Sequence, residues 1–307
     1  MIDLHLHLDG SLTPYEILEL SRLSAVELPS NDESILHSLL TYNGRGTLDD
    51  YLRKFELPLS VMQSAESVEY ALCALIGRLA EKGYAYVEIR FAPILHTMKG
   101  ATAEHIVQGA LKGLRKASIP VGLILCCMRG QGREENIRTV ELAARYKDDG
   151  VVGVDLAGAE ARYPTEEYRD VFTLASRLGL NITIHAGEAA GEESVRAAMD
   201  FGAKRIGHGI AVKSTDLISR IKANDVLIEV CPTSNLQTGA VDSIDRHPIA
   251  RFLESGISVA LCSDNMTVSD TDVLREWQKV KCAFDYSDEV FARMMSDARS
   301  HAFLGGF

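Results

Sequence analysis

Val151-Val-Gly-Val-Asp-Leu-Ala157 is a short run of β-branched and apolar residues with little alternation of polar and apolar positions. Such a run is typical of a parallel strand that is buried on both faces. Seven further runs of the same character occur along the chain: Ile2–Leu8, Tyr84–Ala92, Val121–Met128, Asn181–His185, Arg205–Gly209, Leu227–Cys231 and Ser258–Cys262. The sequence therefore predicts eight buried strands.

Segments with helical periodicity separate these runs. The spacing of apolar residues predicts helices over Ala65–Lys82, Ala103–Lys116, Glu134–Tyr146, Glu166–Leu178 and Thr215–Ala223. Strands that alternate with helices predict the α/β class and a (β/α)₈ TIM barrel, with a doubly wound open sheet as the alternative. No repeat, low-complexity tract or linker divides the chain, so we expect residues 1–307 to form a single domain.

The segment from Leu12 to Lys82 is the longest one without a predicted strand. It contains a loop, Thr41–Thr47, followed by an amphipathic helix around Leu48–Leu57. Material inserted after the first strand would lie over the carboxyl-end mouth of a barrel. We therefore expect a helical insertion at the place of a lid, with a plain packing helix as the alternative for Leu48–Leu57.

Composition limits the classes of partner. The formal net charge is −11 at pH 7, and nucleic acids and anionic membranes both require a basic surface, so neither is an expected partner. No apolar run approaches the roughly 18 residues of a membrane span, and the amino terminus carries no signal-like segment. The six cysteines include no C-x-x-C pair, which favours reduced thiols, and we expect a cytoplasmic protein.

Polar side chains occur where the predicted strands end. Catalytic groups of a (β/α)₈ barrel lie at the carboxyl ends of its strands, and buried histidines and carboxylates are costly unless something binds them. The residues at these ends are His5, His7, Asp9, Arg90, Asp155, Gly158, Glu160, His185, Glu188, His208, Ser234, Asn235, Asp264 and Asn265. The sequence therefore predicts an active site at this end of the barrel.

His5 and His7 are the first candidate metal ligands. Alternate residues of a strand point to the same side, so both imidazoles can face one ion. Such a pair alone is more often satisfied by ordinary hydrogen bonds. With His185 and Asp264 at later strand ends, the set becomes three imidazoles and a carboxylate, which suits a catalytic Zn²⁺ with a position left for water. We expect one zinc ion per chain.

Glu188 and His208 are candidates for acid–base chemistry. Two small residues in His185-Ala-Gly-Glu188 let the chain turn, so that the Glu188 carboxyl returns to the site, where partial burial would hold its proton near neutral pH. A glutamate that only begins a helix is the alternative. His208 lies between two glycines that allow close approach to the metal, with a core histidine as the alternative. The remaining histidines are expected to be surface or packing residues: His37, His96, His105, His247 and His301.

Six separated motifs resemble, in order, those of the adenosine deaminase family of the amidohydrolase superfamily, and the resemblance covers most of the chain. They are His5-Leu-His-Leu-Asp-Gly10, Asp155-Leu-Ala-Gly158, His185-Ala-Gly-Glu188, Gly207-His-Gly209, Glu229-Val-Cys-Pro-Thr-Ser-Asn235 and Ser263-Asp-Asn265. The resemblance implies a zinc-dependent hydrolytic deaminase of a purine nucleoside, active in purine salvage. It also implies that His5, His7, His185 and Asp264 hold the zinc ion.

The resemblance implies a role for each remaining residue of the site. Asp264 with His208 would take the proton of a zinc-activated water and direct the resulting hydroxide at purine C6. Glu188 would protonate purine N1. Gly158 would offer its backbone N–H to N3, and Asp9 would accept a hydrogen bond from a ribose hydroxyl. The products would be inosine and ammonia.

Two residues bear on the choice of substrate. Relatives that act on the free base tend to carry Glu in place of Asp9, so Asp9 favours adenosine and 2′-deoxyadenosine. The best-known members carry two consecutive Asp after the last strand, whereas the second is Asn265 here, whose amide can donate to purine N7 at any pH. Adenine, a 5′-modified adenosine and aminodeoxyfutalosine are the alternative substrates. A catalytically silent purine-binding protein and a metal-assisted amide or phosphoester hydrolase are the alternatives from other classes.

Overall fold

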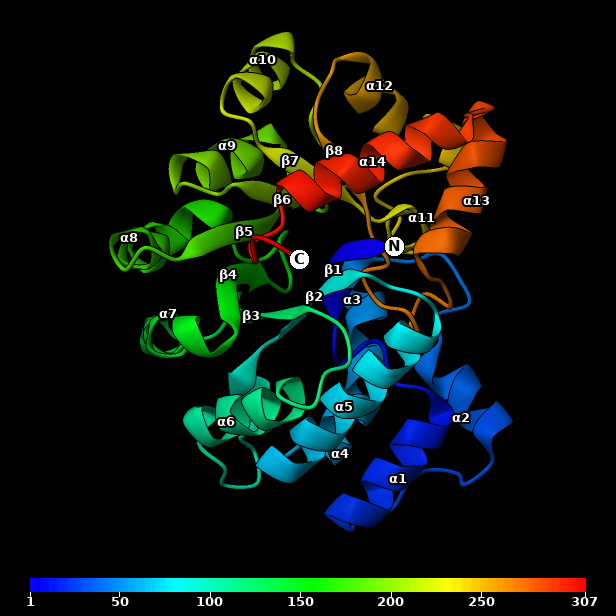
Figure 1. Ribbon diagram of the computed structural model, residues 1–307, viewed down its shortest axis with the longest axis vertical. Helices are drawn as coiled ribbons and strands as arrows, with labels where there is room; N and C mark the ends of the chain where they lie inside the picture. The colour runs from blue at the N-terminus through cyan, green and yellow to red at the C-terminus, as the bar shows by residue number, and fades with distance from the viewer.

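Eight parallel strands form one sheet in which each strand pairs with the next along the chain. The computed structural model describes residues 1–307. The strands are β1 (Ile2–His7), β2 (Tyr86–Phe91), β3 (Val121–Met128), β4 (Val151–Ala157), β5 (Asn181–Ala186), β6 (Arg205–His208), β7 (Leu227–Val230) and β8 (Val259–Leu261). They surround a common axis, with helices outside (Figure 1). The predicted (β/α)₈ TIM barrel is confirmed, and the open sheet is wrong.

The barrel closes between β8 and β1 at residues that the sequence predicts as metal ligands. The N–H of His7 donates to the carbonyl of Asp264 at 2.7 Å, and the N–H of Asp264 donates to the carbonyl of His5 at 2.8 Å. Asp264 has a φ of 58°, in the left-handed region that Asp enters more readily than most residues. The closure therefore fixes these three residues relative to one another.

Helices follow the strands and cover the outside of the sheet (Figure 1). Those after β2 are α6 (Ala103–Leu114), α7 (Arg133–Arg145), α8 (Arg169–Arg177), α9 (Glu192–Asp200), α10 (Thr215–Ala223), α11 (Pro232–Gln237), α12 (Ile249–Glu254), α13 (Val273–Phe284) and α14 (Asp288–Ser300), with short 3₁₀ helices η2 (Pro93–His96), η3 (Lys147–Asp149), η4 (Thr165–Tyr168) and η5 (Ile244–Arg246). The helix predicted over Glu166–Leu178 is divided into η4 and α8.

The insertion between β1 and β2 is helical, as predicted. It consists of α1 (Pro14–Ser24), α2 (Glu33–Leu40), α3 (Leu48–Leu52), η1 (Arg53–Phe55), α4 (Glu56–Val61) and α5 (Ala65–Glu81). The single helix predicted over Leu48–Leu57 is wrong in detail, because α3, η1 and α4 divide this segment. Pro58 has no N–H to donate to the carbonyl of Lys54, so a continuous helix would lose a hydrogen bond there. Pro58 instead lies in the first turn of α4.

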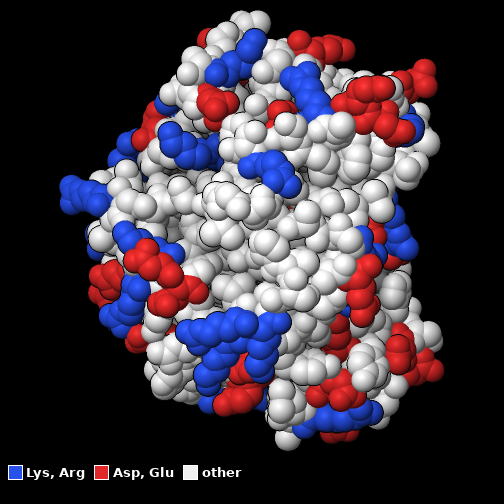
Figure 2. All heavy atoms as spheres, viewed as in Figure 1, with Lys and Arg blue, Asp and Glu red and all other residues white.

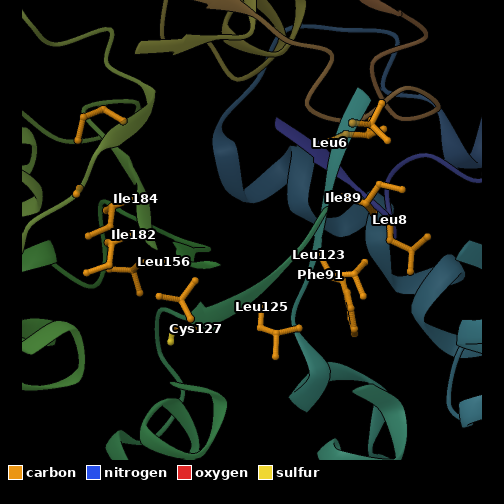
Figure 3. Packing of buried hydrophobic residues seen from close by; sticks show 14 of the residues in the cluster. Leu6, Leu8, Ile89, Phe91, Leu123, Leu125, Cys127, Leu156, Ile182 and Ile184 are labelled. Carbon is orange, nitrogen blue, oxygen red and sulfur yellow. The ribbon is translucent and has the colours of Figure 1, made fainter. Parts of the chain in front are cut away.

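Alternate residues of the strands form the core between the sheet and the helices. Figure 3 shows side chains of this layer, all of them buried: Leu6, Leu8, Ile89, Phe91, Leu123, Leu125, Cys127, Leu156, Ile182 and Ile184. The residues between them are polar at several positions, including His5, Arg90, Asp155 and His185. Since successive side chains of a strand point to opposite faces, these polar groups meet inside the barrel.

The carboxyl-terminal residues cover the amino end of the barrel. The ring of Phe303 lies 3.5 Å from the guanidinium carbon of Arg205, and Phe307 stacks on Tyr86. Arg205 and Tyr86 are the first residues of β6 and β2. Both termini lie near the middle of the face in Figure 1, and Figure 2 shows a broad uncharged area there. None of the helices combines the length and the apolar character that crossing a membrane requires.

Candidate active site

A cavity of about 210 Å³ lies at the carboxyl ends of the strands. Every residue to which the sequence assigns a metal-binding, catalytic or substrate-binding role lines it except His5, which is fully buried. Its polar lining comprises His7, Asp9, Gly158, His185, Glu188, His208, Ser234, Asp264 and Asn265. The insertion contributes apolar lining: Leu48, Tyr51, Leu52, Phe55 and Leu59. The insertion therefore covers this end of the barrel.

Three imidazoles and one carboxylate converge beside the cavity. Nε2 of His7 lies 3.2 Å from Nε2 of His185, and Oδ1 of Asp264 lies 3.5 Å from Nε2 of both His5 and His7. Ligand atoms about 2.0–2.1 Å from a tetrahedral metal ion stand about 3.3–3.4 Å apart. His5 Nε2 is buried without a hydrogen-bond partner, which is costly unless a cation takes its lone pair. The four side chains therefore fit one metal ion.

Carboxylates behind the cluster orient two of the imidazoles. Nδ1 of His5 lies 2.8 Å from Oε2 of Glu229, and Nδ1 of His185 lies 2.9 Å from Oδ2 of Asp155. A carboxylate on Nδ1 holds the proton there, which leaves the Nε2 lone pair for a metal. The inner faces of β4 and β7 thus set the tautomers of ligands on β5 and β1.

Two buried arginines balance part of this negative charge. Arg90 lies 3.2 Å from Asp155 and 3.0 Å from Glu229, and Arg205 lies 2.7 Å from Glu229 and also pairs with Glu88. Burial alone raises the pKa of Glu229, but the two guanidinium groups outweigh burial and hold the pKa below its usual range. Glu229 therefore stays ionised as an acceptor for His5.

Glu188 turns into the cavity as predicted. Gly187 has a φ of 72°, which a residue with a Cβ rarely adopts, and the chain bends there after β5. The Glu188 side chain is only 5% exposed. Burial first, and then the charges of Asp264 and Glu160, raise the pKa of Glu188 to about 8. This carboxyl can therefore hold a proton at neutral pH.

Glu160 anchors the turn that carries Glu188. Its carboxylate accepts the N–H groups of four consecutive residues, Gly187 to Ala190, at 2.7–3.1 Å. The hydroxyl of Ser194 donates to the same carboxylate. Both oxygens thus face only donors, so an ionised carboxylate suits this position and an amide does not.

His208 ends β6 with a φ of 67°, beside the metal cluster. Its Nε2 lies 3.6 Å from Oε2 of Glu188, and its Nδ1 lies 3.0 Å from Nδ2 of Asn235. Asn235 in turn lies 3.3 Å from Nε2 of His247, which is buried. The expectation that His247 is only a surface or packing residue overlooked this contact, because residues after η5 show no periodic pattern.

His96 contacts the residue predicted to bind ribose. It is fully buried, and its Nε2 lies 3.2 Å from Oδ1 of Asp9. Its Nδ1 donates to the carbonyl of Met62 at 2.7 Å, because a carbonyl can only accept. The sequence interpretation missed His96, although its place on η2, just after β2, is a signal that could have identified it.

Gly158 and Asn265 line the cavity as predicted. Gly158 has a φ of 103°, and its N–H has no acceptor within the protein. Nδ2 of Asn265 donates to Oδ1 of Asp264 at 2.7 Å, so one of its two N–H groups is already used. A Cβ on Gly10 would lie 1.9 Å from Oδ1 of Asn265, which explains the glycine at that position.

Comparisons with known proteins agree with this geometry. The adenosine deaminase family model matches residues 1–306. A relative from Haemophilus ducreyi named adenosine deaminase is 41% identical over 315 residues, which cover 99% of this chain and 92% of the relative. Crystal structures of an adenine deaminase from Arthrobacter aurescens (25% identity, TM-score 0.89, 99% and 94% of the two chains) and of an Arabidopsis N6-mAMP deaminase (26%, 0.88, 99% and 93%) share the fold. The chain therefore belongs to the adenosine deaminase family.

Proposed function

We propose that this protein hydrolyses adenosine and 2′-deoxyadenosine to the corresponding inosine and ammonia, using one zinc ion per chain. The observation that carries the proposal is the lining of a single cavity. Three metal-ligand side chains, the buried carboxyl of Glu188 and the carboxylate of Asp9 all line it. This combination provides metal ligands, a proton donor and polar groups suited to a sugar.

Zinc is the proposed ion because the donor set is three imidazoles and one carboxylate. Such sets suit zinc, and catalytic zinc sites keep one position open for water or substrate. His5, His7, His185 and Asp264 would hold the ion. When bound, zinc supplies a Lewis acid that lowers the pKa of water to near neutrality.

Asp264 and His208 are proposed to prepare the water for attack on purine C6. Oδ1 of Asp264 faces the imidazoles of His5 and His7, so this carboxylate is close enough to accept the proton of a water held there. His208 lies beside the same metal-ligand cluster and would orient the water oxygen. Apolar residues of the insertion would exclude bulk water.

Glu188 is proposed to donate a proton to purine N1. Thr238 Oγ1 donates to Oε1 of Glu188 at 3.2 Å, which leaves Oε2 to carry the proton. Protonation at N1 makes C6 more electrophilic as water attacks. The raised pKa of about 8 keeps this proton in place at neutral pH.

Recognition of the nucleoside is proposed to use both ends of the substrate. The free N–H of Gly158 would donate to N3, and the second amide hydrogen of Asn265 would donate to N7. Asp9, which lies beside His96, would accept a ribose hydroxyl. No Lys or Arg lines the cavity, which favours a neutral nucleoside over a nucleotide that carries a phosphate.

The relatives support the same substrate. The relative named adenosine deaminase shares 41% of aligned residues with this chain, whereas the adenine and N6-mAMP deaminases share 25% and 26%. We further propose that residues 1–307 act as one domain, because a single core cluster of 64 buried residues extends from Leu6 to Met294. A cytoplasmic role in purine salvage is part of the same proposal.

Steady-state kinetics on a panel of purines tests the proposal. The panel contains adenosine, 2′-deoxyadenosine, adenine, AMP and aminodeoxyfutalosine, with deamination followed by the loss of adenine absorbance. We expect the highest kcat/KM for the two nucleosides. Inertness toward both nucleosides, together with turnover of another member, would assign a different substrate.

A further inference from the structure

Three side chains outside the metal cluster form a chain of hydrogen bonds that ends at His208. They are His247, Asn235 and His208 itself, and all three are at least nine-tenths buried. The first link is fixed by the backbone. The N–H of Ile249 donates to Nδ1 of His247 at 3.2 Å. A backbone N–H can only donate, so Nδ1 of His247 must present a lone pair.

The tautomer of His247 fixes the orientation of the Asn235 side-chain amide. A neutral imidazole with a lone pair on Nδ1 carries its hydrogen on Nε2, and Nε2 lies 3.3 Å from Oδ1 of Asn235. Burial lowers the pKa of His247 to about 3, which keeps this ring neutral. If the amide were reversed, both ring nitrogens of His247 would face donors, and no protonation state of imidazole offers two lone pairs.

The amide of Asn235 in turn fixes the tautomer of His208. With Oδ1 directed at His247, Nδ2 donates to Nδ1 of His208 at 3.0 Å. A neutral His208 therefore carries its hydrogen on Nε2. That atom belongs to the cavity side of the ring, 3.6 Å from Oε2 of Glu188.

We propose that Asn235 and His247 are positioning residues that hold His208 in the Nε2–H tautomer, so that His208 donates a hydrogen bond to the attacking water. This inference rests on the proposed function. In this state His208 has no lone pair at Nε2 and cannot accept the proton of the water, which leaves Asp264 as the acceptor. Asp264 would then take the proton of the water, and His208 would only orient the water.

The test combines nuclear magnetic resonance with kinetics on the zinc-loaded enzyme. Long-range ¹H–¹⁵N spectra of protein labelled in its histidines report which ring nitrogen of His208 bears the hydrogen, with the His208→Gln variant for assignment. We expect Nε2–H in the wild type. A wild-type spectrum with Nδ1–H would overturn the proposal without any variant, and this reading does not depend on the substrate.

Asn235→Asp is the decisive variant, because the second carboxylate oxygen would face Nδ1 of His208 and require a hydrogen there. We expect the Nδ1–H tautomer, an unchanged zinc content, and a kcat for adenosine lower by on the order of 100-fold, as when a donor to a developing charge is lost. KM should change by less than about threefold if binding contacts are intact. An unchanged tautomer or an unchanged kcat would contradict the proposal.

His247 offers a matched pair of substitutions. His247→Gln keeps a donor and an acceptor on one side chain, so it should retain most of the turnover that His247→Leu loses, about tenfold in kcat. His105→Leu, at an exposed position on α6, is the control for removing a histidine. Equal loss in the Gln and Leu variants would indicate a purely structural role. A correct tautomer in an enzyme that is inert toward adenosine would refute the proposed substrate and leave the tautomer assignment standing.

Discussion

At the scale of single residues, the site depends on where protons reside before substrate arrives. Carboxylates behind His5 and His185 hold hydrogens on Nδ1, and burial holds a hydrogen on Glu188. The barrel interior supplies each of these partners from a different strand. Single conservative substitutions can therefore separate proton transfer from metal binding.

Glu188→Gln should abolish turnover and leave the zinc content unchanged. The amide keeps the size of the side chain but cannot give a proton to N1, and such proton transfers contribute about 10²–10⁴ in rate. We expect kcat to fall by at least about 10³. Kinetics with metal analysis of the same sample provides the check; a variant with wild-type turnover would remove Glu188 from the mechanism.

The raised pKa of Glu188 also predicts how stability depends on pH. The folded state holds this proton up to about pH 8, whereas the unfolded chain releases it near 4.5. Between these values the native state binds more protons, so its contribution to stability falls as pH rises, by up to about 1.4 kcal/mol per pH unit. Denaturant titrations of proteins in one metal state should show Glu188→Gln gaining stability over the wild type as pH approaches 8. If the unfolding free energies of the two proteins changed with pH in parallel, the pKa of Glu188 would not be raised in the folded state.

Asp9→Ala should lower kcat/KM for the nucleoside but not for the free base. If Asp9 accepts a ribose hydroxyl, its loss removes a charged hydrogen bond of about 1.5–3 kcal/mol, or roughly 10- to 150-fold in kcat/KM for adenosine. Adenine has no ribose, so the kcat/KM for adenine should be the same in the variant and the wild type. An equal loss with both compounds would show that Asp9 acts on the base or on the fold.

At the scale of elements, the short connections after the strands determine where several side chains of the site lie. The predicted strands agree with the observed ones to within two residues at each end, because continuous apolar runs are unambiguous in a parallel barrel. Connections carry no such pattern. His96 on η2 and His247 after η5 therefore escaped prediction, and Pro58 divided a helix that periodicity alone made continuous. The ligand cluster could be predicted because its members end strands.

Glu160→Gln should loosen the turn after β5. An amide can accept on one atom only, so at least one of the N–H groups of Gly187 to Ala190 would face a donor instead of an acceptor. We expect a loss of about 2 kcal/mol or more in unfolding free energy and a kcat at least tenfold lower. Glu166→Gln, exposed on the neighbouring η4, is the control. Equal behaviour of the two variants would show that Glu160 does not hold the turn.

At the scale of the whole molecule, the proposed metal would join the two ends of the barrel sheet. Its ligands come from β1, from β5 and from the residues after β8, where the barrel closes. Removal of the metal by a chelator should therefore lower the melting temperature, and added zinc should restore it. A ligand at 1,000 times its Kd stabilises by about 4 kcal/mol. Calorimetry provides the check, and His185→Ala, which already lacks one ligand, should respond far less.

Hydrolysis of adenosine in ¹⁸O-labelled water tests the central claim most directly. The zinc-loaded protein should release one ammonia per adenosine and yield inosine that carries one ¹⁸O atom at C6, and the chelator-treated protein should yield none. Mass spectrometry of the purine product reads both results. Inosine without the label, or a zinc-loaded protein that leaves adenosine intact, would contradict the account.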